Sequence, residues 1–256
     1  MRFGKLGSRS RPTTVAAAPG FDPQNDVAGL MVWFEARYGV LNNADAAASN
    51  GEGIKTWNSQ GDQVYSIAQA SSTLRPTLNT SPGVSFNGQS VLSFDGIDDY
   101  LIATTNPAAG PIMDGAGTTT FMVWAPRDNN SHFNIPLSGG TSNGQLFFEN
   151  GESVLDTSVN MMMGAGANVL TSVYTYETKY YTTLQFNGAS SKHWKNRVLV
   201  GTANAGTNGS NGISVGALRT GGEPFKGYLA ALLIYNGALD AAEIALVEDY
   251  LVLTYG

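Results

Sequence analysis

The feature that most constrains the fold is a series of short apolar segments separated by stretches of Gly, Asn, Ser and Thr. Residues 29–36, 118–125 and 228–235 are strand-sized and rich in the aromatic and branched side chains that favour β-structure. Glycine contributes 31 of the 256 residues, which suits many tight turns. Similar segments occur at 54–57, 91–101, 145–149, 169–176, 180–186, 194–200 and 213–217. This pattern predicts an all-β protein in which two sheets pack face to face as a sandwich.

One segment near the end of the chain has helical rather than strand periodicity. Asp240 is placed to cap a first turn, and Glu243, three residues later, completes a capping box. Apolar residues then recur on one helical face at Ile244, Val247 and Leu251. We therefore predict one C-terminal helix, and we assign the carboxylates of Glu248 and Asp249 to its solvated face.

The segment 91–101 contains the pair Asp95-Gly96 between two short apolar runs. Asp-Gly is a strong signal for a two-residue hairpin turn, because glycine readily adopts a positive φ. We predict a β-hairpin here, with Phe94 and Tyr100 packing inward on either side of the turn.

Composition indicates the compartment in which the chain folds and the partners that it does not bind. It contains no cysteine, so it has neither disulfides nor thiol chemistry, which favours folding in a reducing cytoplasm. The N-terminal residues lack the apolar core of a signal peptide, and no apolar run approaches the roughly 20 residues of a membrane span. The formal net charge of −6 argues against nucleic-acid binding by the folded domain. We expect no contact with a membrane.

Residues 1–26 are predicted to form an extended arm in front of a single domain at 27–256. Gly, Ser, Pro and Ala dominate the arm, which has no periodic apolar face. Its basic residues all precede the first acidic residue and are Arg2, Lys5, Arg9 and Arg11. Besides a free tail, two interpretations are open: contact with acidic neighbouring subunits, or contact with DNA. These four cations give modest phosphate affinity, so we favour subunit anchoring.

Three segments carry a resemblance to a known family. They are LMVWFEA at 30–36, FNGQSVLSFDGIDDYL at 86–101 and FKGYLAALLIYNGALDAAEIALVEDYLVLTYG at 225–256. They resemble laminin-G-like, concanavalin-A-like jelly-roll domains, which occur in bacterial surface proteins and bacteriophage virion proteins. The resemblance implies a two-sheet jelly roll over most of residues 29–256. It says little about function, because this fold hosts lectins, adhesion modules, hydrolases and structural proteins.

The resemblance, the missing signal peptide and cysteines, and the N-terminal arm together predict a bacteriophage virion structural protein. In this hypothesis the chain is a head decoration protein, a head fibre or a spike component, made in the host cytoplasm and located in the virion. The arm would bind other virion proteins, such as the major capsid protein or neck and tail proteins, and the chain would form a homo-oligomer. The alternative is a carbohydrate-binding adhesin of a phage tail or bacterial surface, which contacts host glycans. A glycan hydrolase is the third and least favoured interpretation.

Catalytic motifs are weak in this sequence. Glycosidases of the fold place paired carboxylates on one strand, but Glu149 and Glu152, the nearest pair, are spaced so that they point to opposite faces. The only histidines are His132 and His193, and neither has the sequence setting of a metal site or a catalytic triad. The sequence therefore predicts no enzymatic activity and no required cofactor.

Calcium is one ligand hypothesis. Many members of the family bind Ca²⁺ through aspartate carboxylates and loop carbonyls, because a hard cation prefers several oxygen ligands. The candidates here are Asp95, Asp98 and Asp99. An aspartate in a turn also has a structural role, so both interpretations stay open.

Carbohydrate is the other ligand hypothesis, because the faces of aromatic rings stack on sugar rings. The candidates for an exposed aromatic platform are Trp194, Tyr180 and Tyr181. We assign Trp57 and Trp124 to the core instead, since both lie in strongly apolar or strand-like segments.

Overall fold

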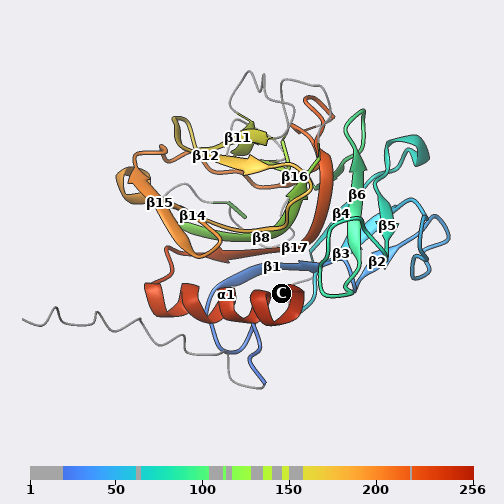
Figure 1. Ribbon diagram of the computed structural model, residues 1–256, viewed down its shortest axis with the longest axis horizontal. Coiled ribbons are helices and arrows are strands. Elements are labelled where there is room, and N and C mark those ends of the chain that lie inside the picture. Colours follow the sequence, from blue (N-terminus) through green and yellow to red (C-terminus); the bar gives the residue numbers. More distant parts are fainter. Residues whose placement is uncertain are drawn as a thin grey trace, which may run out of the picture.

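The computed structural model of the chain describes residues 20–61, 65–103, 112–113, 117–127, 135–139, 146–149, 158–219 and 221–256. These residues form two antiparallel β-sheets that face each other, followed by one α-helix, α1 (Ala241–Tyr255) (Figure 1). The predicted all-β sandwich with a C-terminal helix is therefore confirmed. Among the described residues, no helix is long and apolar enough to cross a membrane.

The first sheet, sheet A, has eight strands within the described residues. In spatial order they are β15 (Val198–Ala203), β14 (Ser191–Lys195), β13 (Tyr180–Phe186), β8 (Thr118–Pro126), β17 (Lys226–Asn236), β6 (Val91–Asp95) and β5 (Thr77–Asn79), with β1 (Leu30–Glu35) paired to β17 beside β6. Residues Gly227 to Tyr235 of β17 are all buried, as expected for a central strand that is covered on both faces.

The second sheet, sheet B, has nine strands within the described residues. In spatial order they are β12 (Asn168–Thr175), β11 (Ser158–Gly164), β10 (Leu146–Glu149), β9 (Leu137–Gly139), β16 (Ile213–Val215), β7 (Leu101–Ala103), β4 (Ser66–Ala68), β3 (Thr56–Asn58) and β2 (Val40–Leu41). Two short 3₁₀ helices, η1 (Ser72–Leu74) and η2 (Gly188–Ser190), lie in the connections.

An apolar core rich in aromatic rings fills the space between the sheets. The ring centroid of Trp124 on β8 lies 5.1 Å from that of Tyr174 on β12 and 5.4 Å from that of Phe147 on β10. Trp57 on β3 packs against Phe34 on β1, with their ring centroids 4.9 Å apart. Both tryptophans are fully buried, so their assignment to the core is confirmed. Tilted and edge-on ring pairs of this kind stabilise a core beyond the area that they bury.

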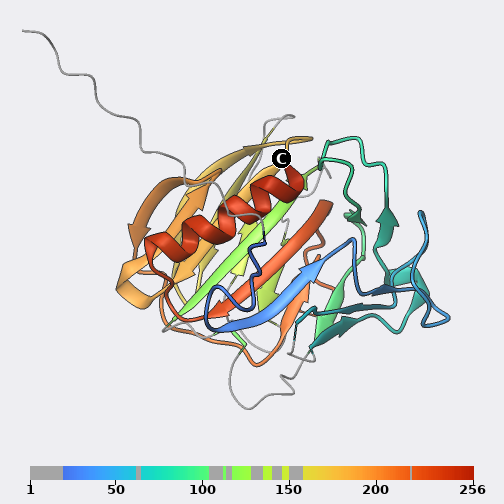
Figure 2. The same ribbon diagram turned by 90° about the horizontal axis from the view of Figure 1, so that it is seen from below.

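A second apolar layer lies between the outer face of sheet A and α1 (Figures 1 and 2). On the helix it contains the side chains that the sequence pattern placed on one face: Ile244, Val247 and Leu251. Asp240 accepts hydrogen bonds from the backbone N–H groups of Ala242 and Glu243, and the Glu243 carboxylate accepts from the N–H of Asp240. The predicted capping box is present and begins the helix at the expected residue.

The predicted hairpin at 91–101 is wrong. β6 pairs with β5 and β17 in sheet A, whereas β7 pairs with β4 and β16 in sheet B, so residues 96–100 carry the chain from one sheet to the other. Gly96 does have a positive φ, of 79°, and Phe94 is buried as expected, but Tyr100 is half-buried. An Asp-Gly turn reverses or redirects the chain locally, and its chemistry does not select the partner of the next strand.

Residues 20–26, the part of the predicted arm that the structure describes, pack on the body of the domain. The ring of Phe21 lies 5.7 Å from that of Tyr250 on α1. The carbonyl oxygen of Pro23 accepts a hydrogen bond from the buried hydroxyl of Tyr235 on β17, at 2.9 Å. These contacts fix the described end of the arm against α1 and sheet A. The basic residues Arg2, Lys5, Arg9 and Arg11 lie outside the described residues.

A chain of hydrogen bonds crosses the core and joins the two sheets. The Trp124 indole N–H donates to the Thr182 hydroxyl at 2.9 Å, which lies 3.2 Å from the Tyr174 hydroxyl. The Tyr174 hydroxyl lies 2.8 Å from Nε2 of His193, and Nδ1 of His193 lies 2.9 Å from the Leu170 carbonyl oxygen. The Leu170 carbonyl oxygen can only accept, so Nδ1 of His193 carries a proton and donates to it. Burial lowers the pKa of His193 to about 4, so at neutral pH the ring is uncharged and Nε2 accepts from the Tyr174 hydroxyl.

Candidate functional site

The candidate site is built on the turn between β14 and β15. Asn196 and Arg197 both have a positive φ, of 49° and 69°, as a two-residue hairpin turn of type I′ requires. The side-chain oxygen of Asn196 accepts the N–H of Tyr181 at 3.0 Å, which anchors the turn to β13. Glycine is the preferred second residue of such a turn, so the arginine at 197 holds a costly backbone conformation. Residues in such conformations gather at functional sites.

The side chain of Arg197 reaches from this turn to α1. Its Nη2 forms an ion pair with Asp249, and its Nε lies 3.6 Å from the carboxylate of Glu248. Glu248 also accepts a hydrogen bond from the Thr183 hydroxyl at 2.7 Å, and burial raises its pKa above the usual range. Both carboxylates are buried, so the assignment of Glu248 and Asp249 to a solvated face is wrong. They face the β14–β15 turn, whose position the helix sequence alone does not reveal.

A groove of about 230 Å³ lies between this turn and the first turns of α1. We call it the Trp194 groove, and its described lining residues are Trp194, Arg197, Ala241, Ile244, Ala245 and Glu248. Trp194 is partly exposed, and the small side chains of Ala241 and Ala245 leave space on the helix side of the groove. The groove therefore combines an aromatic ring, an ion pair with hydrogen-bonding capacity and small apolar side chains.

The three aromatic residues predicted as a platform are not brought together. Tyr180 points into the core, where its ring lies 4.7 Å from that of Tyr174, and it is only 5% exposed. Tyr181, the next residue, points to the opposite face and, like Trp194, packs against the apolar layer beneath α1. Neighbouring residues of a strand alternate between faces, so Tyr180 and Tyr181 cannot line one surface. Trp194 alone of the three lines the groove.

Arg197 and Glu248 were not identified from the sequence. The signal for the arginine was an Asn-Arg pair between two strand-like segments, which fits a two-residue turn. The signal for Glu248 was a carboxylate one position from the apolar face of the helix. Neither signal indicates a site without knowledge of how α1 packs on sheet A. His132 and Glu152 lie outside the described residues.

The three aspartates predicted to bind calcium do come together, between β6 and β7. One carboxylate oxygen from each of Asp95, Asp98 and Asp99 lies within 4.8 Å of the others. Asp99 accepts the N–H of Asp95 at 3.0 Å, and Asp95 accepts that of Ile97 at 2.8 Å. Several carboxylate oxygens at this spacing suit a hard cation such as Ca²⁺, and the same contacts also stabilise the turn. Calcium binding here stays a prediction.

Asp99→Asn is expected to raise the free energy of unfolding at pH 8 and to leave it nearly unchanged at pH 4. Burial, together with the charge of Asp95, raises the pKa of Asp99 to about 6, from a usual value of 3.8. The folded state therefore loses stability as the pH rises from 3.8, the usual pKa of an aspartate, to about 6, the pKa of Asp99 in the folded protein. Ionisation of Asp99 costs about 2 kcal/mol, which asparagine avoids while still accepting the Asp95 N–H.

Urea unfolding with a chelator present, at both pH values, measures this effect. Asp45→Asn serves as the control, because Asp45 is 62% exposed and is expected to show a much smaller difference. An Asp99→Asn variant that is less stable than the wild-type protein at pH 8 would contradict the prediction. Repeating the wild-type measurement with added calcium tests the calcium hypothesis.

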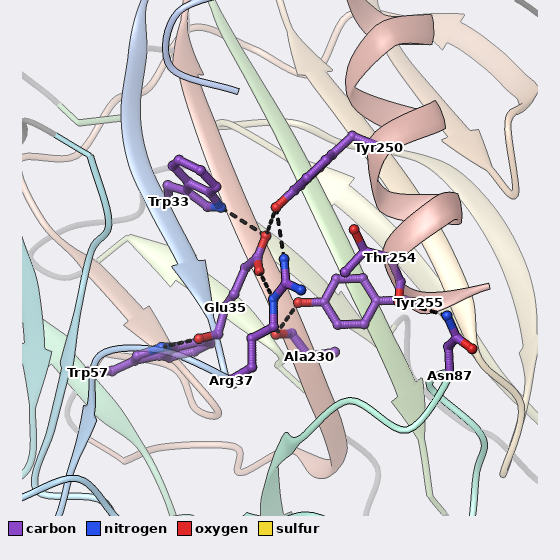
Figure 3. A network of polar contacts seen from close by, with 9 residues as sticks. All are labelled: Trp33, Glu35, Arg37, Trp57, Asn87, Ala230, Tyr250, Thr254 and Tyr255. Atoms are coloured by element: carbon purple, nitrogen blue, oxygen red, sulfur yellow. Dashed lines mark hydrogen bonds and ion pairs between the residues drawn. The ribbon is translucent and has the colours of Figure 1, made fainter. Parts of the chain in front are cut away.

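A fully buried carboxylate, Glu35, lies near the other end of α1 (Figure 3). It accepts hydrogen bonds from the Trp33 indole at 2.9 Å and from the Tyr250 hydroxyl, and it forms an ion pair with Arg37. Burial opposes the charge on Arg37, but the hydrogen bond and charge of Glu35 outweigh it and raise the pKa of Arg37. Glu35 is fully engaged by these three side chains, so we assign it to helix attachment rather than to ligand binding.

Comparison with known proteins identifies the fold. No protein-family model and no curated protein matches the chain. An arabinofuranosidase complexed with arabinofuranosyl-α-1,2-xylobiose has 10% identity and a TM-score of 0.65, over 88% of this chain and 63% of that one. The Trypanosoma rangeli sialidase in complex with the inhibitor DANA has 13% identity and a TM-score of 0.53, over 87% of this chain and 33% of that one. The binding domain of botulinum neurotoxin serotype D has 9% identity and a TM-score of 0.50, over 88% of this chain and 51% of that one.

This chain spans less than two thirds of each of these proteins, and at such identities the similarity shows the fold alone. It supports the β-sandwich that the resemblance implied. The prediction that the chain is not an enzyme is contradicted, because the arabinofuranosidase and the sialidase are enzymes with a similar fold. That prediction required paired carboxylates at a fixed spacing on one strand. Folding instead brings charged side chains together from distant segments, as it does for Arg197 and Glu248.

Proposed function

We propose that the chain is a carbohydrate-binding protein and that the Trp194 groove receives a sugar ring. The observation that carries this proposal is the position of Trp194, which lines a groove beside the ion pair of Arg197 and Glu248. An aromatic face packs against the C–H face of a sugar ring, and nearby charged and polar groups bond to its hydroxyls. Sugar recognition needs this pairing of an apolar wall with a few fixed polar groups.

The conformation of the β14–β15 turn supports the same proposal. Arg197 occupies a backbone position that favours glycine, and its side chain is held by two buried carboxylates. Such an arrangement fixes the guanidinium before a ligand arrives, which lowers the entropy cost of binding. Fold similarity adds support, because the arabinofuranosidase structure contains an arabinofuranosyl-xylobiose ligand.

Trp194→Ala is expected to weaken glycan binding by at least about tenfold, because the stacking face is lost. Trp194→Phe is expected to retain part of the affinity, since a smaller aromatic face remains. A glycan array identifies the ligand, and isothermal titration calorimetry of the three proteins then compares affinities.

Tyr38→Ala is the matched control for this experiment. Tyr38 is also a surface aromatic, 50% exposed, but it does not line the groove. Its loss is expected to leave glycan binding unchanged. A wild-type protein that binds no glycan on the array, or a Trp194→Ala variant with unchanged affinity, would overturn the proposal.

The role in a bacteriophage virion stays a separate hypothesis. It rests on the sequence resemblance and on the basic arm, most of which lies outside the described residues. A virion protein can also bind host glycans, so the two proposals are compatible. Mass spectrometry of purified particles tests the virion hypothesis, and particles that lack this chain would reject it.

A further inference from the structure

We propose that the Trp194 groove selects uncharged sugar rings and rejects acidic ones. This inference rests on the proposed function of the groove and adds the class of sugar that it takes. The reason lies in the state of Arg197, the only cationic side chain among the described residues that line the groove.

An arginine in a sugar site commonly recognises an acidic sugar, because its planar fork matches a carboxylate with two parallel hydrogen bonds. In this protein two carboxylates of α1 already pair with the N–H groups of this fork. Nη2 forms an ion pair with Asp249, and Nε lies 3.6 Å from Glu248. An incoming carboxylate would have to displace these partners to form the same two bonds.

The two helix carboxylates also oppose an acidic ligand directly. Glu248 and Asp249 are 5% and 8% exposed, so water screens them poorly, and Glu248 is itself part of the groove wall. Like charges brought together at a poorly solvated site repel strongly. Another cation, Lys192, has its Nζ 5.8 Å from the centroid of the Trp194 ring. A lysine ammonium is a hydrated point charge without the fork geometry that a carboxylate prefers.

A neutral sugar meets none of these obstacles. Its hydroxyls can accept hydrogen bonds from the guanidinium N–H groups that Asp249 leaves unused, because arginine carries five N–H donors. They can also donate to the carboxylate oxygens of Glu248. The ring of Trp194 supplies the apolar face, and the methyl groups of Ala241 and Ala245 leave room beside it. The groove wall therefore has partners for hydroxyl groups, whereas its one guanidinium is already paired with carboxylates of α1.

The β14–β15 turn fixes the position from which the Arg197 side chain reaches the groove. Arg197 is held at a φ of 69°, and the turn is tied to β13 by the Asn196 side chain. The guanidinium therefore cannot swing freely towards solvent without breaking the ion pair with Asp249. Removing that carboxylate is expected to release the fork for an external anion.

The test uses pairs of sugars that differ only in charge: glucose with glucuronate and galactose with galacturonate, each coupled to the same carrier surface. Wild-type protein is expected to bind at least one neutral member about tenfold more tightly than its acidic partner. Asp249→Asn is expected to shift the ratio of acidic to neutral binding about tenfold towards the acidic partner. Asp45→Asn, which removes an exposed carboxylate outside the groove, is expected to behave as wild type.

Each outcome separates this inference from the proposed function. Wild-type protein that binds neither these sugars nor any glycan on the array overturns both. Wild-type protein that binds the acidic sugars as tightly as the neutral ones, with binding lost in Trp194→Ala, overturns the selectivity and keeps the groove. If Asp249→Asn does not fold, as judged by circular dichroism, Glu248→Gln replaces it, because glutamine still accepts the Thr183 hydroxyl. A folded variant without this shift in the ratio towards the acidic sugars overturns the role of the helix carboxylates.

Discussion

Glu35→Ala is expected to lower the free energy of unfolding by about 3 to 5 kcal/mol, the usual cost of removing one partner from a buried ion pair. The carboxylate is fully buried and satisfies three side chains at once: Trp33, Arg37 and Tyr250 (Figure 3). Alanine leaves the indole N–H without its acceptor and the guanidinium without its counter-charge. It also removes the link between β1 and the last turns of α1.

Denaturant unfolding of the variant measures this loss. Glu177→Ala is the matched control, because Glu177 also pairs with an arginine, Arg127, but at an exposed site. That change is expected to cost less than about 1 kcal/mol. Glu35→Gln separates charge from shape: its amide oxygen still accepts from Trp33, but its amide nitrogen opposes Arg37, so an intermediate loss is expected. A Glu35→Ala variant as stable as Glu177→Ala would show that the network does not hold the helix.

Lowering the pH from 7 to 4 is expected to remove about 3 kcal/mol of stability through His193 alone. Burial lowers the pKa of His193 from a usual value of 6.5 to about 4, and the nearby charge of Lys195 acts in the same direction. Between pH 6.5 and about 4, the histidine therefore binds a proton in the unfolded chain but not in the folded protein. Stability from the neutral ring is complete above pH 6.5 and is lost as pH falls towards 4.

The hydrogen-bond chain explains why the folded protein resists this protonation. Nε2 of His193 accepts from the Tyr174 hydroxyl, and Nδ1 donates to the Leu170 carbonyl. A second proton on Nε2 would face the tyrosine proton and would place a charge between the sheets. Because β12 and β14 belong to different sheets, this protonation is expected to loosen their contact.

Urea unfolding across this pH range, compared between wild type and His193→Gln, isolates the contribution. The variant is expected to be less stable at pH 7, because its side chain cannot replace both hydrogen bonds, and to have a flatter pH dependence. Val198→Ala, at an exposed side chain that carries no titratable group, is the control and is expected to keep the wild-type slope. Parallel pH profiles for wild type and His193→Gln would contradict the assignment.

Features that depend on neighbouring residues could be predicted from the sequence. The capping box at Asp240 and Glu243 formed as expected, because the two residues complete each other within one helical turn. The burial of Trp57 and Trp124 was likewise predictable, since apolar strand segments must pack against another layer. The aspartates at 95, 98 and 99 came together because the turn residues between them are few.

Features that depend on contacts between distant segments could not be predicted from the sequence. The Asp95-Gly96 turn has the chemistry of a hairpin, yet the chain passes to the other sheet, because strand pairing is decided by the whole topology. Tyr180 was named as a surface residue, although strand alternation places it in the core once β13 has its place in sheet A.

The sequence by itself determined the strand-rich class, the single α-helix of the described residues with its cap, and the aromatic residues available for a core or a ligand. Only the tertiary structure decided that Arg197 would meet Glu248 and Asp249 and that Trp194 would line a groove beside them. Turns and caps depend on contacts within a few residues, which the order of amino acids fixes directly. The groove depends on a helix packing against a hairpin about 50 residues earlier in the chain, and such long-range contacts follow from the burial of the whole apolar surface.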